Sequence, residues 1–132
     1  GASGIIFGTL FQSGAKAVSG CSELDGKGLA SIFRVSLDAI KARGGAQPGD
    51  KTMVDALEPA VEAMEGCGSE ELADLFAAAE EAARQGMEAT KNYEAKFGRA
   101  KSLMQRSIGY QDAGATSVWI IFKAMHEYVS RQ

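Results

Sequence analysis

The sequence is poor in the residues from which metal sites and disulfides are built. Its 132 residues include one histidine, two cysteines and two prolines. Cys21 and Cys67 fall in separate loop segments with no second ligand residue nearby, so a thiolate–imidazole metal site has almost nothing to draw on. We therefore predict two free thiols and a reducing, cytoplasmic compartment.

Long apolar runs and an excess of one charge are missing as well. No run approaches the length of a membrane span, and the N-terminus lacks the basic-then-apolar pattern of a signal peptide. Fourteen Lys and Arg stand against seventeen Asp and Glu, without a basic cluster. We therefore expect neither a membrane nor a nucleic acid as partner. At 45% hydrophobic residues, the chain is long enough for one domain with its own core.

Apolar residues recur at helical spacing along most of the chain, and no stretch alternates as a strand would. This spacing predicts five helices, over residues 4–19, 29–40, 50–64, 69–97 and 118–129. Helices joined by loops, without strands, predict an all-α bundle.

Several residues predict how the helices begin, bend or break. Asp50 and Ser69 are residue types that cap helix N-termini, and we expect them to cap the third and fourth helices. Pro59 lacks a backbone donor, so it predicts a kink or a break in the third helix. Gly86 has a low helix propensity, so it marks the point at which the long fourth helix could bend.

Two loops rich in glycine and polar residues each lead into a helical run. Residues 44–55 read G-G-A-Q-P-G-D-K-T-M-V-D. The second loop begins with G-R-A at 98–100 and continues with R-S-I-G-Y-Q-D-A-G-A-T-S at 106–117. A glycine-rich turn at a helix start presents unpaired N–H groups at the positive end of the helix dipole, which favours phosphate.

These segments resemble motifs of the nucleotide-binding L subunit, or L domain, of dihydroxyacetone kinases. The pattern R-G-x-A-x-P-G-D-K-T-M-x-D is followed in order by G-R-A and R-S-I-G-x-Q-D-x-G-A-T-S. The opening residues 1–4, G-A-S-G, resemble a further motif, G-G-A-S-G, that precedes a helix. The resemblance implies an antiparallel up-and-down ring or barrel of helices that holds ADP or ATP among the loops at one end.

The resemblance also implies a set of nucleotide-binding residues: Ala2, Ser3, Gly44, Thr52, Met53, Arg99, Asp112, Ala113 and Gly114. Ser3 and Arg99 would bind phosphate oxygens, the latter through a planar guanidinium. Met53 would line the base, because a thioether adapts to a flat ring. The alternatives are an N-terminal cap for Ser3, a core position for Met53 and a helix cap for Asp112, which otherwise accepts from a ribose hydroxyl or an adenine amine.

A metal site is not apparent. Phosphoryl transfer needs a divalent ion held by clustered carboxylates, which the family supplies from an acidic D-x-D-H loop before G-G-A-S-G. This sequence begins inside that later motif and contains no D-x-D. We therefore expect residues 1–132 to be a single domain, the C-terminal portion of an L domain truncated at its N-terminus. Magnesium is expected for the complete domain, its ligands are absent here, and the isolated chain should be inactive.

The implied function is phosphoryl transfer to dihydroxyacetone held on a partner K subunit or domain. The donor would be free ATP, or bound ADP that a phosphocarrier protein recharges, and the catalytic residues are unknown. Two alternatives remain: the nucleotide domain of a fatty-acid kinase, and a non-enzymatic helical interaction module whose loops are only caps and turns. A truncated ring would expose apolar surface, which predicts a homo-oligomer.

Overall fold

The computed structural model describes residues 26–96 and 106–131, and every regular element in them is helical. These elements are α2 (Gly26–Gly44), α3 (Val54–Glu65), α4 (Leu72–Ala89), the short 3-10 helix η1 (Thr90–Asn92) and α5 (Ala113–Ser130). The predicted all-α class is confirmed. The predicted first helix, over 4–19, lies outside the described residues.

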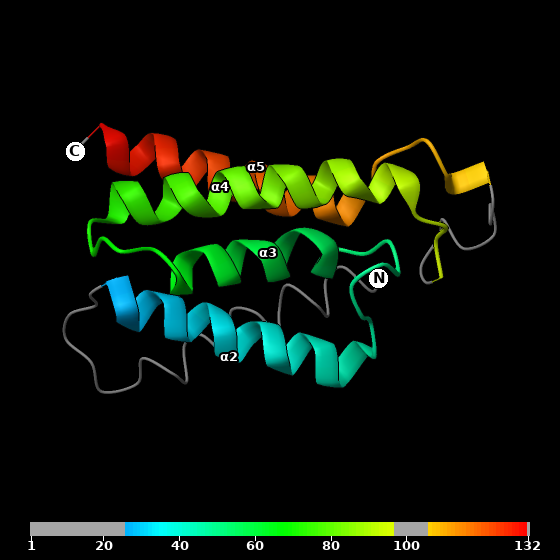
Figure 1. The fold of residues 1–132 in the computed structure, drawn as a ribbon, viewed down its shortest axis with the longest axis horizontal. Coiled ribbons are helices and arrows are strands. Elements are labelled where there is room, and N and C mark those ends of the chain that lie inside the picture. Colours follow the sequence, from blue (N-terminus) through cyan, green and yellow to red (C-terminus); the bar gives the residue numbers. More distant parts are fainter. Residues whose placement is uncertain (1–25, 97–105, 132) are drawn as a thin grey trace.

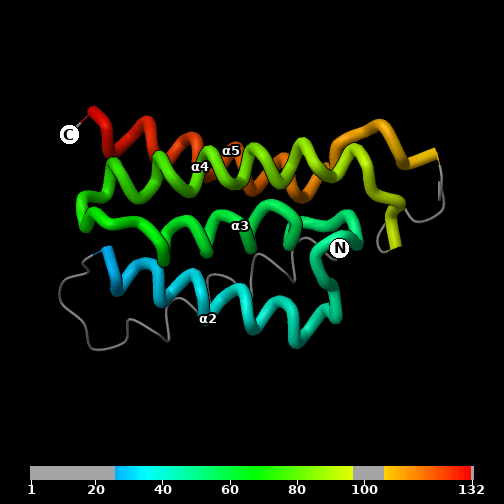
Figure 2. Tube along the Cα trace, viewed as in Figure 1, coloured from blue at the N-terminus to red at the C-terminus, as the bar shows by residue number. Residues whose placement is uncertain are grey.

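Helices that follow one another along the chain run antiparallel, so the chain reverses direction at the two ends of the bundle (Figure 1). At one end, on the right of the view, the first loop (45–53) lies beside the segments 90–96 and 106–112. We call this the loop end. At the other end, the turn end, residues 66–71 connect α3 to α4. Figure 2 shows the C-terminal end of α2 and the starts of α3 and α5 together at the loop end. Closure of the helices into a ring remains a prediction.

Helix α3 is the centre of the described bundle, since it packs against α2, α4 and α5. One face of this helix is acidic, with Glu58, Glu62 and Glu65 at helical spacing, and most of its other residues are buried. Its buried residues are Val54, Asp55, Ala56, Leu57, Ala60, Val61 and Met64. Across the core, the Phe122 ring of α5 lies 5.4 Å from the Phe33 ring of α2 and 6.5 Å from the Phe76 ring of α4, measured between centroids.

Pro59 lies inside the continuous helix α3, so of the predicted kink or break the break is wrong and the kink stays a prediction. Proline has no N–H to donate to the carbonyl four residues earlier, which is that of Asp55. Gly86 of α4 lies against this carbonyl: a Cβ built on Gly86 would be 2.0 Å from the Asp55 oxygen. The neighbouring backbone therefore covers the carbonyl that proline leaves without a helical partner. Gly86 lies within the continuous helix α4 and provides close approach between two helices.

The helix ends agree with the sequence at α2 and differ at α3 and α4. Helix α2 covers the predicted run 29–40 and extends to Gly44, and the following Gly45 adopts a left-handed φ of 71°. Asp50 does not cap α3, which begins later; its carboxylate accepts from the Gln47 N–H at 2.9 Å within the loop. Ser69 does not cap α4 either.

The Ser69 hydroxyl instead accepts from the N–H of Glu71 at 3.1 Å, and α4 begins after that residue. Helix α4 also ends earlier than predicted: the α-helix stops at Ala89, and a single 3-10 turn follows. The apolar spacing that continues to Phe97 does not reflect one continuous helix. Phe97 itself lies outside the described residues.

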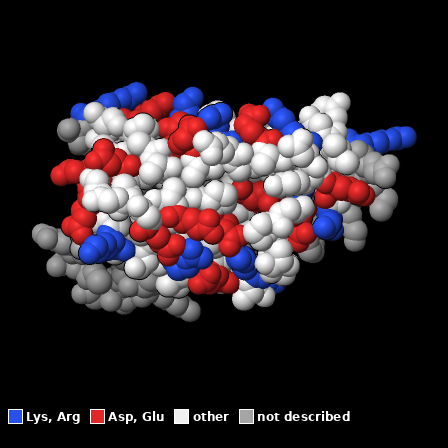
Figure 3. All heavy atoms as spheres, viewed as in Figure 1, with Lys and Arg blue, Asp and Glu red and all other residues white. Residues whose placement is uncertain are grey.

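Charges of both signs are interspersed on the face shown in Figure 3. Two ion pairs join α2 to α3: Arg34 with Glu65 at 2.5 Å, and Lys41 with Glu58 at 2.8 Å. Within the described ranges, no helix combines the length and the apolar character needed to cross a membrane.

Candidate functional site

The predicted site residues that the structure describes all lie at the loop end (Figure 1). Gly44 is the last residue of α2, Thr52 and Met53 directly precede α3, and Asp112, Ala113 and Gly114 form the start of α5. Ala2, Ser3 and Arg99 lie outside the described residues. The first loop and the described part of the second, 106–117, therefore meet at one end of the bundle.

Met53 and Gly114 form the contact between these loops. A Cβ on Gly114 would lie 3.3 Å from the Met53 Cβ and 3.2 Å from Oδ2 of Asp112. The starts of α3 and α5 therefore approach so closely that a side chain at residue 114 would need its neighbours to move. Met53 is only 4% exposed, so most of its side chain belongs to the core.

The other predicted residues are more open. Gly44 is exposed, and a Cβ there would meet nothing within 4 Å. Ala113 is exposed as well. Thr52 is half-buried, and its hydroxyl accepts from the Val54 N–H at 3.2 Å, in the first turn of α3. Arg106, a cation in the second loop, is exposed.

Asp112 is the N-cap of α5. Its Oδ2 accepts from the Ala115 N–H at 2.9 Å, while its own N–H donates to Oγ1 of Thr90 at 2.8 Å. Burial raises the pKa of the Asp112 carboxyl, and the Ala115 N–H and the charge of Lys51 act in the opposite direction. The helix cap, one of the two alternatives given for Asp112, is therefore observed, with Oδ2 as the acceptor for Ala115. The Gly114 N–H also acts on this carboxyl and opposes the rise in its pKa.

Asp55 fixes the first loop, a role that the sequence analysis missed. Its carboxylate is buried and accepts from two loop amides, the Gly49 N–H at 2.7 Å and the Thr52 N–H at 2.9 Å. Two backbone donors from the loop are therefore satisfied by one side chain of the following helix. The sequence signal was an aspartate in the first helical turn, which normally suggests only a favourable charge near the dipole.

Lys51 is the second residue that the sequence analysis missed. Only 3% of it is exposed, although it lies in a polar loop. Its Nζ donates to the carbonyl oxygens of Thr90 and Ser107, each at 2.7 Å, and to that of Tyr110. Burial lowers the pKa of the Lys51 ammonium, and the charges of Asp112 and Asp55 oppose that shift.

We call the Lys51 ammonium and these three carbonyls the clamp. An ammonium has three N–H donors, and the clamp uses all three, so Lys51 has none left for a ligand phosphate. The clamp joins the first loop to the end of α4 and to the second loop. A side-chain hydroxyl adds a further bond beside the clamp: Ser107 Oγ accepts from the Ala95 N–H at 2.9 Å.

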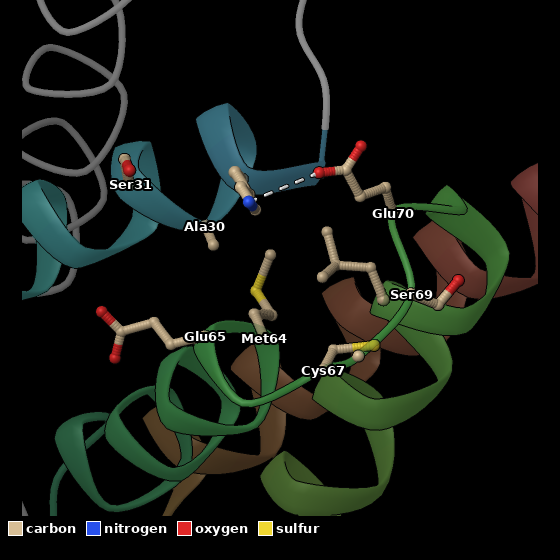
Figure 4. A pocket seen from close by; sticks show the side chains of 11 residues that line it. Ala30, Ser31, Met64, Glu65, Cys67, Ser69 and Glu70 are labelled. Carbon is tan, nitrogen blue, oxygen red and sulfur yellow. Dashed lines mark ion pairs between the residues drawn. The ribbon is translucent and has the colours of Figure 1, made fainter.

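The turn end carries a hollow of about 450 Å³, far from these loops. In Figure 4, Ala30 of α2, Met64 of α3 and Cys67 of the turn lie around it. The ion pair drawn there, between Lys27 and Glu70, is 3.9 Å long and largely exposed. Because the predicted nucleotide-binding residues lie at the opposite end, we do not assign the nucleotide to this hollow.

Metal ligands do not gather in the part of the chain that the structure describes. No group of three His, Cys, Asp or Glu side chains there is placed to hold an ion. The three loop carboxylates have other partners: Asp50 and Asp55 bind loop amides, and Asp112 caps α5.

Comparison with known proteins identifies the family. The DAK2 domain family matches residues 1–127. The ADP-binding subunit DhaL of PEP-dependent dihydroxyacetone kinase from Escherichia coli K12 is 39% identical over 127 residues, which are 95% of this chain and 60% of that protein. The corresponding subunit of kinase 1 from Listeria innocua is 38% identical over 125 residues, 95% of this chain and 58% of that protein.

A third relative, the L-erythrulose 1-kinase of Mycolicibacterium smegmatis, is 34% identical over 131 residues, which are 99% of this chain and 23% of that enzyme. The chain thus spans about three fifths of the length of the two DhaL subunits and less than a quarter of this longer kinase. With the motifs, the helical fold and a family match over almost its full length, the chain belongs to the DAK2 domain family.

Proposed function

We propose that this chain is the nucleotide-holding part of a dihydroxyacetone kinase and that ADP or ATP binds at its loop end. The observation that carries this proposal is the meeting of the two motif loops, with Met53 against Gly114 and beside Asp112. Its electrostatics suit a nucleotide, because the positive ends of the α3 and α5 dipoles lie together there, which favours phosphate. The E. coli and Listeria relatives named as ADP-binding subunits support the same assignment.

Within this site we assign roles to individual residues. Oδ2 of Asp112 holds the Ala115 N–H, so we assign Oδ1 to a ribose hydroxyl or the adenine amine. Gly44 and Met53 line the base; the burial of Met53 leaves only an edge of its thioether for that contact. Thr52, Ala113 and Gly114 contribute backbone at the two helix starts. Ala2, Ser3 and Arg99 complete the set as phosphate ligands, on the strength of the motifs alone.

The reaction we propose is transfer of a phosphoryl group to dihydroxyacetone held on a separate K subunit or domain. The donor is ATP, or ADP recharged by a phosphocarrier protein; the two DhaL relatives described above are named as PEP-dependent. Magnesium would neutralise phosphate charge during transfer. We assign it no ligand among the described residues, where no cluster of three suitable side chains is present.

The remaining proposals concern the state of the protein. We propose a cytoplasmic location, which the free thiol of Cys67 supports, and a single domain that forms the C-terminal portion of an L domain.

We also propose that the chain self-associates. Light scattering at high protein concentration is the test, and a monomer under those conditions would contradict the proposal. Kinase turnover by this chain with a K subunit would contradict the proposal that it is inactive alone.

The alternative functions are less well supported. The relatives described above are named as dihydroxyacetone and erythrulose kinases, which favours a ketose over a fatty acid as the phosphoryl acceptor. A purely structural interaction module would not need two motif loops held against each other by a buried cation.

Calorimetric titration with magnesium-ADP tests the proposed site. We expect saturable binding by the wild-type chain and roughly tenfold weaker binding by Asp112→Asn. Asparagine preserves the helix cap, so the loss would report the missing charge and acceptor rather than a frayed helix. Asp74→Asn is the matched control, since Asp74 is an exposed carboxylate in the first turn of α4 at the turn end. No binding by the wild type, or equal losses in both variants, would contradict the proposal.

A further inference from the structure

The clamp contains a cation that the proposed nucleotide chemistry does not use. Lys51 is buried, and its three ammonium donors point to carbonyls of Thr90, Ser107 and Tyr110. These acceptors are 39, 56 and 59 residues away along the chain. One side chain therefore joins three backbone segments that no regular secondary structure connects.

The backbone of Lys51 is itself unusual. Its φ is 63°, in the left-handed region, which non-glycine residues adopt infrequently and only at an energetic cost. Such a conformation persists where surrounding contacts determine it, and here the buried ammonium contacts do so. The neighbouring Thr52 and Met53 take their position directly from this residue.

The other side of the clamp leads to the second loop. Thr90, whose carbonyl binds the Lys51 ammonium, also accepts the N–H of Asp112 through its hydroxyl at 2.8 Å. Tyr110, a second acceptor, precedes Asp112 by two residues. Lys51 is thus connected by one or two hydrogen bonds to residues on both sides of the proposed nucleotide site.

We propose that Lys51 is a positioning residue, which sets the distance between the two nucleotide-binding loops without touching the nucleotide. This inference rests on the proposed function for its consequence in binding, but the clamp itself can be tested without nucleotide. The three carbonyls converge on one ammonium nitrogen, and a side chain without three donors cannot satisfy them together. The backbone bond from the Lys96 N–H to the Asp50 carbonyl would remain, but the loops would lose the contact that they share through Lys51.

The first experiment compares ADP affinity in Lys51→Met and in a matched control, Lys41→Met. Lys41 is partly buried and binds Glu58 at 2.8 Å between α2 and α3, so its loss also removes an interhelical contact but leaves the clamp intact. We expect the ADP affinity of Lys51→Met to be at least about tenfold lower than that of the wild type, and that of Lys41→Met to change by less than about twofold. A folded Lys51→Met chain that binds ADP like the wild type would overturn the proposal.

Chemical rescue separates positioning from general stability. Lys51→Ala leaves space for a small cation beside the three carbonyls, and we expect ammonium or methylammonium ions to restore ADP affinity toward the wild-type value. The same ions should not change Lys41→Met. A folded Lys51→Ala chain whose ADP affinity does not respond to these ions would overturn the role of the clamp.

Nuclear magnetic resonance of the wild-type chain without nucleotide needs no variant to fold. The ammonium protons of Lys51 should exchange with water far more slowly than those of Lys96, whose side chain is 63% exposed. Equal exchange rates would overturn the clamp. If the wild type shows slow exchange but no ADP binding, the proposed function fails, and with it the positioning role, while the clamp stands.

Discussion

The two ends of the bundle reverse the chain by different means. At the turn end, the Ser69 hydroxyl binds an amide two residues away, and the Lys27–Glu70 pair is mostly exposed at 85% and 60%. At the loop end, Lys51 is buried and its ammonium bonds join residues far apart in the sequence. Buried, fully partnered polar groups hold a unique geometry, whereas local exposed contacts contribute little.

This difference indicates where the molecule requires fixed geometry. The turn end needs only to connect α3 to α4, and it tolerates a hollow of about 450 Å³ beside it. The loop end holds two motif loops at a set distance, with Gly114 against Met53. If this comparison is correct, equivalent substitutions should have large effects at the loop end and small ones at the turn end.

The largest expected effect is that of Gly86→Ala. The added methyl would meet the Asp55 carbonyl oxygen at 2.0 Å, and that atom belongs to the backbone of α3, so α3 and α4 would have to separate. We expect a loss of about 3 kcal/mol in the free energy of unfolding, measured with urea. Gly68→Ala at the turn end is the control, because its methyl would enter open space. Similar losses in both would contradict the comparison.

Thr90→Val should have the next largest effect. The substitution keeps the shape of a buried side chain but removes the hydroxyl that accepts the Asp112 N–H and donates to the Met87 carbonyl. Leaving those groups unsatisfied should lower the free energy of unfolding by about 1–3 kcal/mol. At the turn end, Ser69→Ala removes an exposed local bond, and we expect a loss below about 0.5 kcal/mol. A negligible effect of Thr90→Val would show that the polar network at the loop end is not needed.

The sequence predicted the local features and missed the distant ones. The helices followed from apolar spacing, and the cap at Asp112 was foreseeable because its acceptor binds an amide three residues ahead. Lys51 was missed because its partners are 39 to 59 residues away and are backbone carbonyls, which leave no pattern in the sequence. A lysine in a polar loop is normally exposed.

The same distinction explains the errors at helix boundaries. Asp50 and Ser69 are both suitable caps by residue type, yet each binds an amide in its own turn, and the helices begin later. Pro59 removes a donor locally, yet α3 continues through it, with the Asp55 carbonyl packed against α4. Gly86 of α4 lies against that carbonyl, and only the packed structure brings the two together.

Asp112 gives a smaller effect with a characteristic pH dependence. Asp112→Ala loses the cap of α5, and we expect a decrease of about 1 kcal/mol in the free energy of unfolding. Asp112→Asn keeps the cap and removes the buried charge. Burial raises the folded-state pKa of Asp112 above its ordinary 3.8. At a pH between 3.8 and the raised pKa, the folded chain therefore binds more protons than the unfolded chain.

The stability of the wild type relative to Asp112→Asn should therefore fall as the pH rises through the window from 3.8 to the raised pKa, and then stay constant. Urea unfolding of both proteins between about pH 3 and 7 measures this difference, in which the other titrating groups cancel. A difference that rises with pH would show that the carboxylate is stabilised rather than penalised at the loop end.

Apart from the controls, the smallest expected effect belongs to the exposed pair of Arg34 and Glu65, at the end of α3 near the turn. The guanidinium donates to both carboxylate oxygens, at 2.9 and 2.5 Å, and this bonding lowers the pKa of Glu65. Because the Glu65 side chain is 40% exposed, solvent screens the pair, and Glu65→Gln should cost only about 0.5 kcal/mol at neutral pH.

The pair also has a pH dependence. Because the pKa of Glu65 is lowered in the folded state, the pair stabilises the fold above the ordinary pKa of 4.5, and that stabilisation is lost as the pH falls through the lowered pKa. The wild type and Glu65→Gln should therefore converge in acid and in high salt. A loss as large as that of Thr90→Val would mean that the turn end, too, depends on a fixed polar geometry, and the contrast between the two ends would disappear.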